Sequence, residues 1–507
     1  MRTEAEVTAE KEISLEEHFR KFREHIIGIN EKITTPEQDA IPLLYADWTA
    51  SGRLYDKIEE RLQKDLYPLV ANTHTDTNHT GMTMTYAYHK SQQIIKKHVG
   101  ANSGDVIIST NSGMTGIVNK FQRILGLKLH ESFTDKLKFS EDERPVVFVT
   151  HMEHHSNQTS WYETIADVIV VPPNEEGLVD PERFRKTVKK YERRKTKIAA
   201  VTSCSNVTGI ITPYMDIAQI MHEEGGLCFV DFAASAPYIQ IDMHEDDANG
   251  RYLDALYFSP HKFLGGPGSS GVLVFNKKLY KNKIPDNPGG GTVDWTNPWG
   301  QHKYTDDIEA REDGGTPSFL QTMRAALCCS LKEQMEVAKI RKREDQILNI
   351  IWPELDRIPN LHVLADQHRH RLAIISFYVD GLHYNLGVKM LNDRYGIQTR
   401  GGCSCAGTYG HYLLHVTPEQ SKEITDLISH GDCSTKPGWI RLSVHPTNSD
   451  EEIRFICKAI RELAENFQDW MKNYDYDLSI GRIRHKTHDT TSTMEQNVDR
   501  WLTGSLF

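Results

Sequence analysis

The sequence predicts an α/β protein with a large domain on a mainly parallel seven-stranded sheet and a smaller α+β domain after it. Two observations support this fold class. From about residue 105 to 275, short β-branched runs alternate with helical or loop segments, which is typical of crossover units whose strands pair in parallel. After about residue 318 the pattern changes to a helical run, scattered strand-like segments and one long helix. A chain of 507 residues is long enough for both domains.

Seven runs in the first region are expected to form the strands of the large sheet. They are residues 106–109, 146–150, 168–171, 198–202, 227–231, 255–259 and 271–275. Ligands of such sheets bind beyond the carboxyl ends of the strands. The residues that directly follow these runs are therefore the first candidates for a functional site.

Four parts are expected along the chain. They are a charged helical lead-in at 1–40 that packs with the small domain, a large domain at 41–317, a small domain at 318–472 and a tail at 473–507. Residues 281–317 are rich in Gly, Pro, Asn and Trp, which predicts a long irregular segment. The small domain is expected to hold helices near 318–348 and 449–472, and strands near 371–379 and 440–444.

The composition is that of an ordinary globular protein and narrows the function classes. With 59 Lys and Arg against 70 Asp and Glu, the net charge of −11 disfavours a general nucleic-acid scaffold. No apolar run is long enough to cross a bilayer, and the acidic N-terminus lacks the apolar segment of a secretory signal. The eight cysteines are scattered, so we expect a reduced, cytoplasmic protein with mostly buried thiols.

The segment Ser259-Pro260-His261-Lys262 follows a predicted strand and precedes a glycine-rich turn. A lysine at a buried strand end is unfavourable unless its charge is neutralised or bonded. Formation of a Schiff base removes this cost, and lysine forms one with pyridoxal phosphate. The alternative is a partly exposed loop lysine, and this tetrapeptide alone does not decide between the two.

Two other strand ends favour this cofactor. Asp231 ends the run 227–231, where its carboxylate can pair with a pyridinium nitrogen and keep it protonated. The alternative is an aspartate that caps the next helix. Gly113, Met114 and Thr115 follow the run 106–109 and precede a helical run, so that free amides, a hydroxyl and the helix dipole would form a phosphate site.

Three histidines, His151, His154 and His155, follow the run 146–150. Their spacing is not that of a helical zinc site, and we expect no metal there. A histidine stacked on the ring of a cofactor agrees better with the other three motifs.

These motifs, in this order, resemble the class V aminotransferases of pyridoxal-phosphate fold type I, and among them the cysteine desulfurase and selenocysteine lyase group. The resemblance runs from about Tyr45 to about Ala464 and implies pyridoxal 5'-phosphate, an amino-acid substrate and a homodimer. It implies the following roles: Lys262 for the Schiff base; Asp231 for the pyridine nitrogen; His154 for stacking and proton transfer; Gly113, Met114, Thr115, Ser259 and His261 for the phosphate; Asn206 for O3′ and the substrate carboxylate; Thr316 for the phosphate of the partner subunit; and Arg441 for the substrate α-carboxylate.

The segment from Arg400 to Ala406 is similar to the Arg-x-Gly-x-x-Cys-Ala signature of the short-loop desulfurases. The similarity puts Cys405 at the position of the nucleophile, which takes sulfur as a persulfide and leaves alanine. Cys403 has no role in this pattern; it could resolve a persulfide, join a metal site or, as we expect, fill space. Ala234 departs from the pattern, because desulfurases have Gln or His there as a contact to O3′.

We therefore expect a cysteine desulfurase-like enzyme that converts L-cysteine to L-alanine and has a sulfur-acceptor protein as a candidate partner. One alternative is another class V activity, such as an aminotransferase, epimerase or C–S lyase, in which Cys405 is a spectator. A second alternative is a catalytically silent relative that binds or regulates. Neither nucleic acid nor a membrane is expected as a partner.

Overall fold

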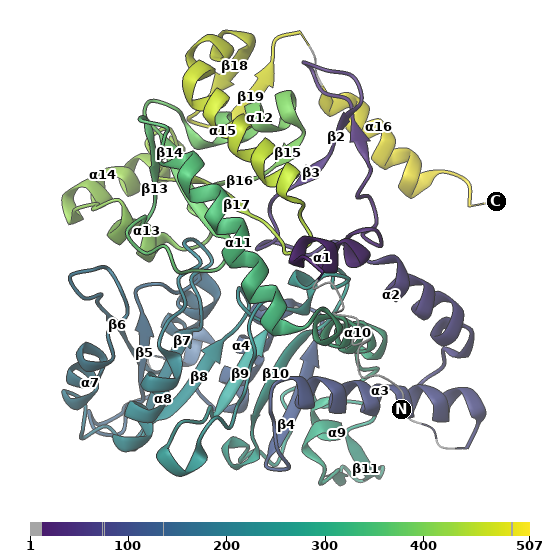
Figure 1. The fold of residues 1–507 in the computed structure, drawn as a ribbon. Coiled ribbons are helices and arrows are strands. Elements are labelled where there is room, and N and C mark those ends of the chain that lie inside the picture. The colour runs from purple at the N-terminus through teal and green to yellow at the C-terminus, as the bar shows by residue number, and fades with distance from the viewer. Residues whose placement is uncertain (1–12, 74, 76, 135, 488–489, 507) are drawn as a thin grey trace, which may run out of the picture.

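A computed structural model describes residues 13–73, 75, 77–134, 136–487 and 490–506 (Figure 1). Residues 1–12, where the sequence predicts the start of the helical lead-in and no secretory signal, lie outside the described residues. No described helix is both long enough and apolar enough to span a bilayer.

The seven predicted strands form one sheet in the order β4-β10-β9-β8-β7-β5-β6. Strands from β9 to β6 pair in parallel, whereas β10 runs antiparallel to both of its neighbours. The prediction of a mainly parallel seven-stranded sheet is therefore confirmed. The strands are β4 (Asp105–Thr110), β5 (Val146–Thr150), β6 (Asp167–Val171), β7 (Lys197–Thr202), β8 (Leu227–Asp231), β9 (Ala255–Phe258) and β10 (Gly271–Asn276).

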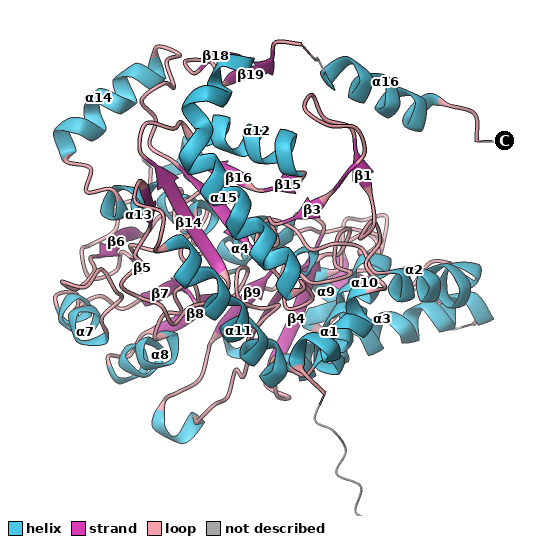
Figure 2. Ribbon diagram, turned by 45° about the horizontal axis from the view of Figure 1, so that its top comes forward, coloured by secondary structure: helices cyan, strands magenta, loops and turns pink. Residues whose placement is uncertain are grey.

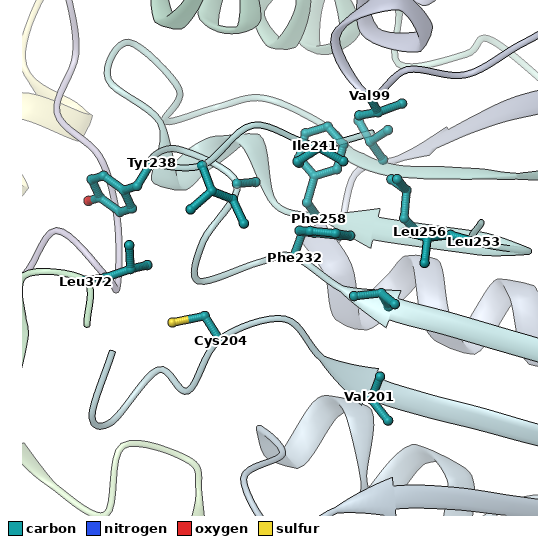
Figure 3. Packing of buried hydrophobic residues seen from close by; sticks show 14 of the residues in the cluster. Val99, Val201, Cys204, Phe232, Tyr238, Ile241, Leu253, Leu256, Phe258 and Leu372 are labelled. Carbon is teal, nitrogen blue, oxygen red and sulfur yellow. The ribbon is translucent and has the colours of Figure 1, made fainter. Parts of the chain in front are cut away.

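Both faces of this sheet are covered, which explains why its strands are continuous apolar runs. On β5, Val147 and Val149 lie in one cluster with Phe121, while Phe148 lies in a second cluster with Phe184. Figure 3 shows part of the second cluster, which includes Val201 of β7 and Leu256 and Phe258 of β9. Figure 2 shows α7 (Pro181–Lys189) and α8 (Tyr214–Glu223) beside the sheet. The other helices of this region are α3 (His79–His98), α4 (Gly113–Ile124), α5 (Glu131–Thr134) and α6 (Thr159–Tyr162).

The second unit is built on an antiparallel sheet in the order β13-β14-β17-β16. Its helix α15 begins after a capping box, in which the side chains of Ser449 and Glu452 each bond the other's backbone N–H. This unit confirms the smaller α+β part of the predicted fold class. Its elements are α11 (Val337–Leu355), β13 (Leu361–Val363), β14 (Ile374–Val379), α12 (Tyr384–Tyr395), β15 (Ile397–Gln398), β16 (Arg400–Gly402), α13 (Gly407–Leu413), α14 (Pro418–Ser429), β17 (Trp439–Ser443) and α15 (Asp450–Trp470).

The helix predicted near 318–348 is two helices in the structure. Glu336, at a φ of 64°, separates α10 (Phe319–Met335) from α11. Buried residues of α10, such as Cys329, pack in the core beside the large sheet, whereas Ile347 of α11 packs in the core of the second unit. Ile340, near the start of α11, still packs in the first core, so the break at Glu336 redirects the rest of α11 into the second.

Short elements occupy the segments for which the sequence predicted little. The irregular segment 281–317 holds a small hairpin and a helix, and a hairpin and a helix follow residue 473. The remaining elements are α1 (Leu15–Arg23), β1 (Lys32–Ile33), β2 (Ile41–Pro42), β3 (Leu44–Tyr45), α2 (Asp56–Arg61), β11 (Val293–Thr296), β12 (His302–Tyr304), α9 (Ile308–Glu312), β18 (Tyr474–Asp477), β19 (Arg482–His485) and α16 (Thr490–Thr503).

Candidate active site

A cavity of about 210 Å³ opens where the carboxyl ends of the large sheet face the second unit. It gathers residues that are far apart in the sequence. The strand ends of the large sheet and the turns after them contribute Ser112, Gly113, Met114, Thr115, His154, Thr202, Cys204, Asn206, Asp231, Ala234, Ser259, His261 and Lys262. The second unit contributes Arg400, Ser404, Cys405 and Arg441. The segment after β3 contributes Thr49 and Ala50. Of the residues to which the family resemblance assigned a role, Thr316 alone lies outside this cavity, and it is exposed.

Lys262 ends a short 3-10 turn, Pro260–Lys262, that directly follows β9. The turn is tight, since a Cβ on Gly266 would lie 1.9 Å from the carbonyl oxygen of Pro260. The amine of Lys262 forms no hydrogen bond or ion pair with any described residue. Burial lowers the pKa of Lys262 to about 8, with Arg441 and Arg400 adding to the effect and Asp231 opposing it. The cavity therefore holds an unbonded amine that loses its proton more readily than an ordinary lysine.

Asp231, the last residue of β8, is 3% exposed and accepts a hydrogen bond from the N–H of Ala233 at 2.8 Å. Burial raises the pKa of Asp231 to about 6, and the charge of Lys262 opposes this rise. A buried carboxylate with a single described hydrogen-bond donor is suited to a cationic group in the cavity, which would supply its missing partner.

Glu153 is a second buried carboxylate next to this site, and the sequence did not single it out. Its Oε1 accepts hydrogen bonds from the backbone N–H and hydroxyl of Thr150 and from the N–H of Thr202, while its Oε2 accepts one from Asn157. Glu153 thus joins the ends of β5 and β7, and it fixes the turn that carries His154. Burial raises the pKa of Glu153 to about 7.

His154 lines the cavity and caps the turn that follows it. The N–H of Ser156 donates to Nδ1 of His154 at 3.1 Å, so that Nδ1 is an acceptor and the neutral ring carries its proton on Nε2. Burial lowers the pKa of His154 to about 3, and the charge of Lys262 adds to the effect. The neighbouring His151 lies outside the cavity and donates from Nε2 to the carbonyl of Gly177.

The turn before α4 has the features of an anion site. Gly113, at a φ of 59°, begins the helix, and the preceding Ser112 makes no side-chain cap. The hydroxyl of Ser259 accepts from the N–H of Met114 at 2.9 Å, and a Cβ on Gly113 would lie 3.4 Å from both Ser259 and His261. Amides, hydroxyls and the positive end of a helix therefore converge on this side of the cavity.

Arg441 on β17 is 2% exposed and reaches the cavity from the second unit. Its Nη2 lies 2.7 Å from Oδ1 of Asp47, and its Nη1 donates to the carbonyl of Asn206 at 3.1 Å. Its Nε and the Oδ1 of Asn206 are buried without a described partner. Asp47 escaped the sequence-based prediction because it lies 394 positions from its partner and no local pattern marks it.

Cys405 lies in a strained loop between β16 and α13. Both Ser404 and Cys405 have left-handed backbone conformations, with φ of 51° and 57°, which non-glycine residues rarely adopt. Cys405 is partly exposed and lines the cavity. The unpaired Arg400 lines the same cavity and forms no ion pair with a described residue.

Two other expectations from the sequence concern neighbouring positions. Ala234 lines the cavity with its methyl group and therefore offers no polar contact. Cys403 is partly exposed and lies outside the residues that line the cavity. Among the described residues, no group of three or more His, Cys, Asp or Glu side chains is arranged to hold a metal ion.

A comparison with known protein families places the chain in one of them. The model of the family described as aminotransferase class-V matches residues 44–456, so this chain belongs to that family.

Relatives within this family carry a more specific name. A probable cysteine desulfurase of Halalkalibacterium halodurans is 28% identical over 437 residues, which cover 85% of this chain and 95% of that protein. A cysteine desulfurase of Haloferax volcanii is 22% identical over 414 residues, 78% of this chain and 92% of that protein.

Two solved structures of this kind share the fold. The apo structure of the cysteine desulfurase from Thermococcus onnurineus matches with a TM-score of 0.68 and 22% identity, over 86% of this chain and 99% of that one. The cysteine desulfurase CsdA of Escherichia coli, solved in an S-sulfonic acid form, matches with a TM-score of 0.67 and 20% identity, over 88% and 98%. These likenesses confirm the predicted fold.

Proposed function

We propose that this chain is a pyridoxal-phosphate-dependent cysteine desulfurase, which converts L-cysteine to L-alanine and takes the sulfur on Cys405. The observation that carries the proposal is the single cavity that brings Lys262, Asp231 and Cys405 together from three distant segments. Membership of the class-V family and relatives named cysteine desulfurases support the same reaction.

The residues of the cavity fit the cofactor. Asp231 would pair with the pyridine nitrogen, His154 would lie on the ring, and the turn before α4 with Thr115, Ser259 and His261 would hold the phosphate. The uncapped start of α4 and the unpartnered Oδ1 of Asn206 are polar groups that such a ligand would satisfy. When bound, pyridoxal phosphate supplies an electron-accepting ring that stabilises negative charge on the substrate carbon next to it.

The same residues orient an amino-acid substrate. Arg441 and Asn206 would bind the α-carboxylate, since a planar guanidinium matches a carboxylate with two parallel hydrogen bonds. Lys262, whose pKa of about 8 is close to neutrality, would take the proton from Cα through Nζ. His154 would assist proton transfer with its Nε2–H, because its Nδ1 is already an acceptor.

Cys405 would receive the sulfur. Its thiolate attacks the substrate sulfur, a new S–S bond forms, and the C–S bond of the substrate breaks with its electron pair left on the carbon. That carbon then takes a proton, so the products are alanine and a persulfide on Cys405, and no external oxidant or reductant is needed. A persulfide on a partly exposed residue can pass to an acceptor protein, which we propose as a partner.

We also propose that the protein is a homodimer in the cytoplasm. The exposed Thr316 would complete the phosphate site of a second subunit in a homodimer, as the family resemblance implies. All eight cysteines are free, and we propose that the protein works in the reducing cytoplasm.

The test compares wild type with Cys405→Ser and, as the matched control, Cys403→Ser. Purified protein is incubated with a panel of amino acids, and alanine, sulfide, pyruvate and keto acids are measured together with persulfide on the protein. We expect alanine and a persulfide from cysteine in wild type and Cys403→Ser, and neither in Cys405→Ser. Alanine at the wild-type rate from Cys405→Ser would contradict the proposed step, and keto acids alone would instead indicate an aminotransferase.

A further inference from the structure

One residue, His155, forms hydrogen bonds to the Cys405 loop on both sides of Ala406. The backbone N–H of His155 donates to the carbonyl of Cys405 at 2.8 Å. Its side-chain Nε2 accepts from the backbone N–H of Gly407 at 2.9 Å. The two bonds flank Ala406, so His155 fixes the chain immediately after Cys405.

This attachment matters because the backbone at the loop is strained. Ser404 and Cys405 both have left-handed φ values, and such a pair persists only where the surroundings determine it. Asn206 donates to the carbonyl of Ser404 at 2.7 Å, which holds the loop on its other side. Release of either attachment would let the pair relax and would move the Cys405 side chain.

The contact with Gly407 needs a neutral imidazole. A protonated ring has no acceptor, and burial together with the charge of Lys436 lowers the pKa of His155. The ring of His154 lies 6.3 Å from it between ring centroids, and the pKa of His154 is lowered as well. At neutral pH the ring of His155 therefore keeps its acceptor. Residue 407 is a glycine at a close approach, since a Cβ there would lie 3.2 Å from Nε2.

We propose that His155 is a positioning residue that holds Cys405 in place for sulfur transfer through the acceptor at its Nε2. The inference rests on the proposed function, because it assigns a role to the loop only if Cys405 takes the sulfur. It concerns a residue that does not line the cavity, so His155 acts through the loop and has no contact with the substrate.

The test uses His155→Leu, which removes the acceptor, and His155→Gln, whose amide oxygen can replace Nε2. Both keep the backbone bond to Cys405. The control is His411→Leu, because His411 also contacts Gly407 but from the exposed side, through the carbonyl. The measurements are kcat and KM for cysteine, amide hydrogen exchange of a peptide that spans residue 407, and the rate at which iodoacetamide alkylates Cys405 in cofactor-free protein.

We expect kcat to fall about tenfold in His155→Leu with KM within twofold, because the groups that bind the carboxylate are unchanged. Amide exchange at 407 and alkylation of Cys405 should both accelerate. His155→Gln should recover most of the loss, and His411→Leu should resemble wild type. Wild-type kcat and amide exchange in His155→Leu, or no recovery in His155→Gln, would overturn the inference.

Failure of the proposed function would look different. In that case wild-type protein makes no alanine from cysteine, while amide exchange and alkylation still report whether His155 holds the loop. Unchanged exchange and alkylation in His155→Leu would reject the inference even if the enzyme is a desulfurase.

Discussion

Asp47 Oδ1 lies 2.7 Å from Nη2 of Arg441, so the arginine that we assign to the substrate carboxylate already has an anionic partner. The pair joins the segment after β3 to β17, and Arg441 is almost completely buried. A buried guanidinium needs such a partner, yet the same carboxylate competes with an incoming substrate.

Asp47→Asn should therefore change binding and stability in opposite directions. We expect KM for cysteine to fall at least threefold, because the substrate no longer competes with a charged side chain. The free energy of unfolding should fall by about 1 to 3 kcal/mol, since a buried cation loses its counter-charge while the amide oxygen still accepts. Steady-state kinetics and urea unfolding measure the two effects, with the exposed Asp39→Asn as the control. An unchanged or higher KM would show that Asp47 does not compete.

Asp231 and Asp47 show which residues of the site can be predicted from the sequence and which cannot. Asp231 was predictable because it ends a β-branched run, and the carboxyl ends of parallel strands meet at one edge of a sheet. The same reasoning found the turn at Gly113 and the segment before Lys262. Asp47 follows a two-residue strand, and its importance comes only from its contact with Arg441.

Other parts of the fold depended on tertiary packing in the same way. The break at Glu336 has no glycine or proline to mark it, and it directs most of α11 into a different core from that of α10. The hairpins after β10 and after α15 are short and mostly polar, so their strands lack the apolar pattern that identified the large sheet.

Glu153→Gln should destabilise the protein even though it removes only a charge. Oε1 of Glu153 accepts three hydrogen bonds, so the amide nitrogen of a glutamine would have to face the amino group of Asn157. Asn157 has no freedom to turn, because its oxygen accepts from Tyr257 and Trp161. One buried donor then loses its acceptor, and we expect a loss of about 1 to 3 kcal/mol in the free energy of unfolding. The exposed Glu163→Gln should stay within about 0.5 kcal/mol of wild type; equal stability of both variants would contradict this account.

Lys262→Met should stabilise the cofactor-free protein at pH 7. The pKa of Lys262 is about 8 in the folded chain and near 10.5 when unfolded, so at pH 7 the lysine is charged in both states and its burial disfavours folding. We expect a gain of roughly 2 to 3 kcal/mol in the free energy of unfolding. Between pH 8 and 10.5 the unfolded chain binds more protons at this site, so wild type gains stability as pH rises and the difference shrinks.

Urea unfolding of both proteins at pH 7 and pH 10 measures this effect. Lys278→Met, on an exposed lysine, serves as the control and should show no such pH-dependent difference. A lower free energy of unfolding for Lys262→Met than for wild type at pH 7 would contradict the prediction that burial of Lys262 destabilises the fold.

The role proposed for Thr316 can be tested by placing two substitutions on the same subunit or on different ones. Thr316→Val removes a hydroxyl, and loss of one hydrogen bond to a phosphate should weaken cofactor binding about tenfold. Lys262→Ala removes the covalent site, so a mixed dimer that carries it on one subunit has one intact lysine.

If Thr316 serves the partner subunit, the intact site is normal when the two substitutions lie on different subunits. It is weakened when both lie on the Lys262→Ala subunit, because that subunit then supplies the defective residue 316. Titration of tagged, purified mixed dimers with pyridoxal phosphate, read from the absorbance of the bound cofactor, separates these cases. The reverse order of affinities would mean that Thr316 serves its own subunit.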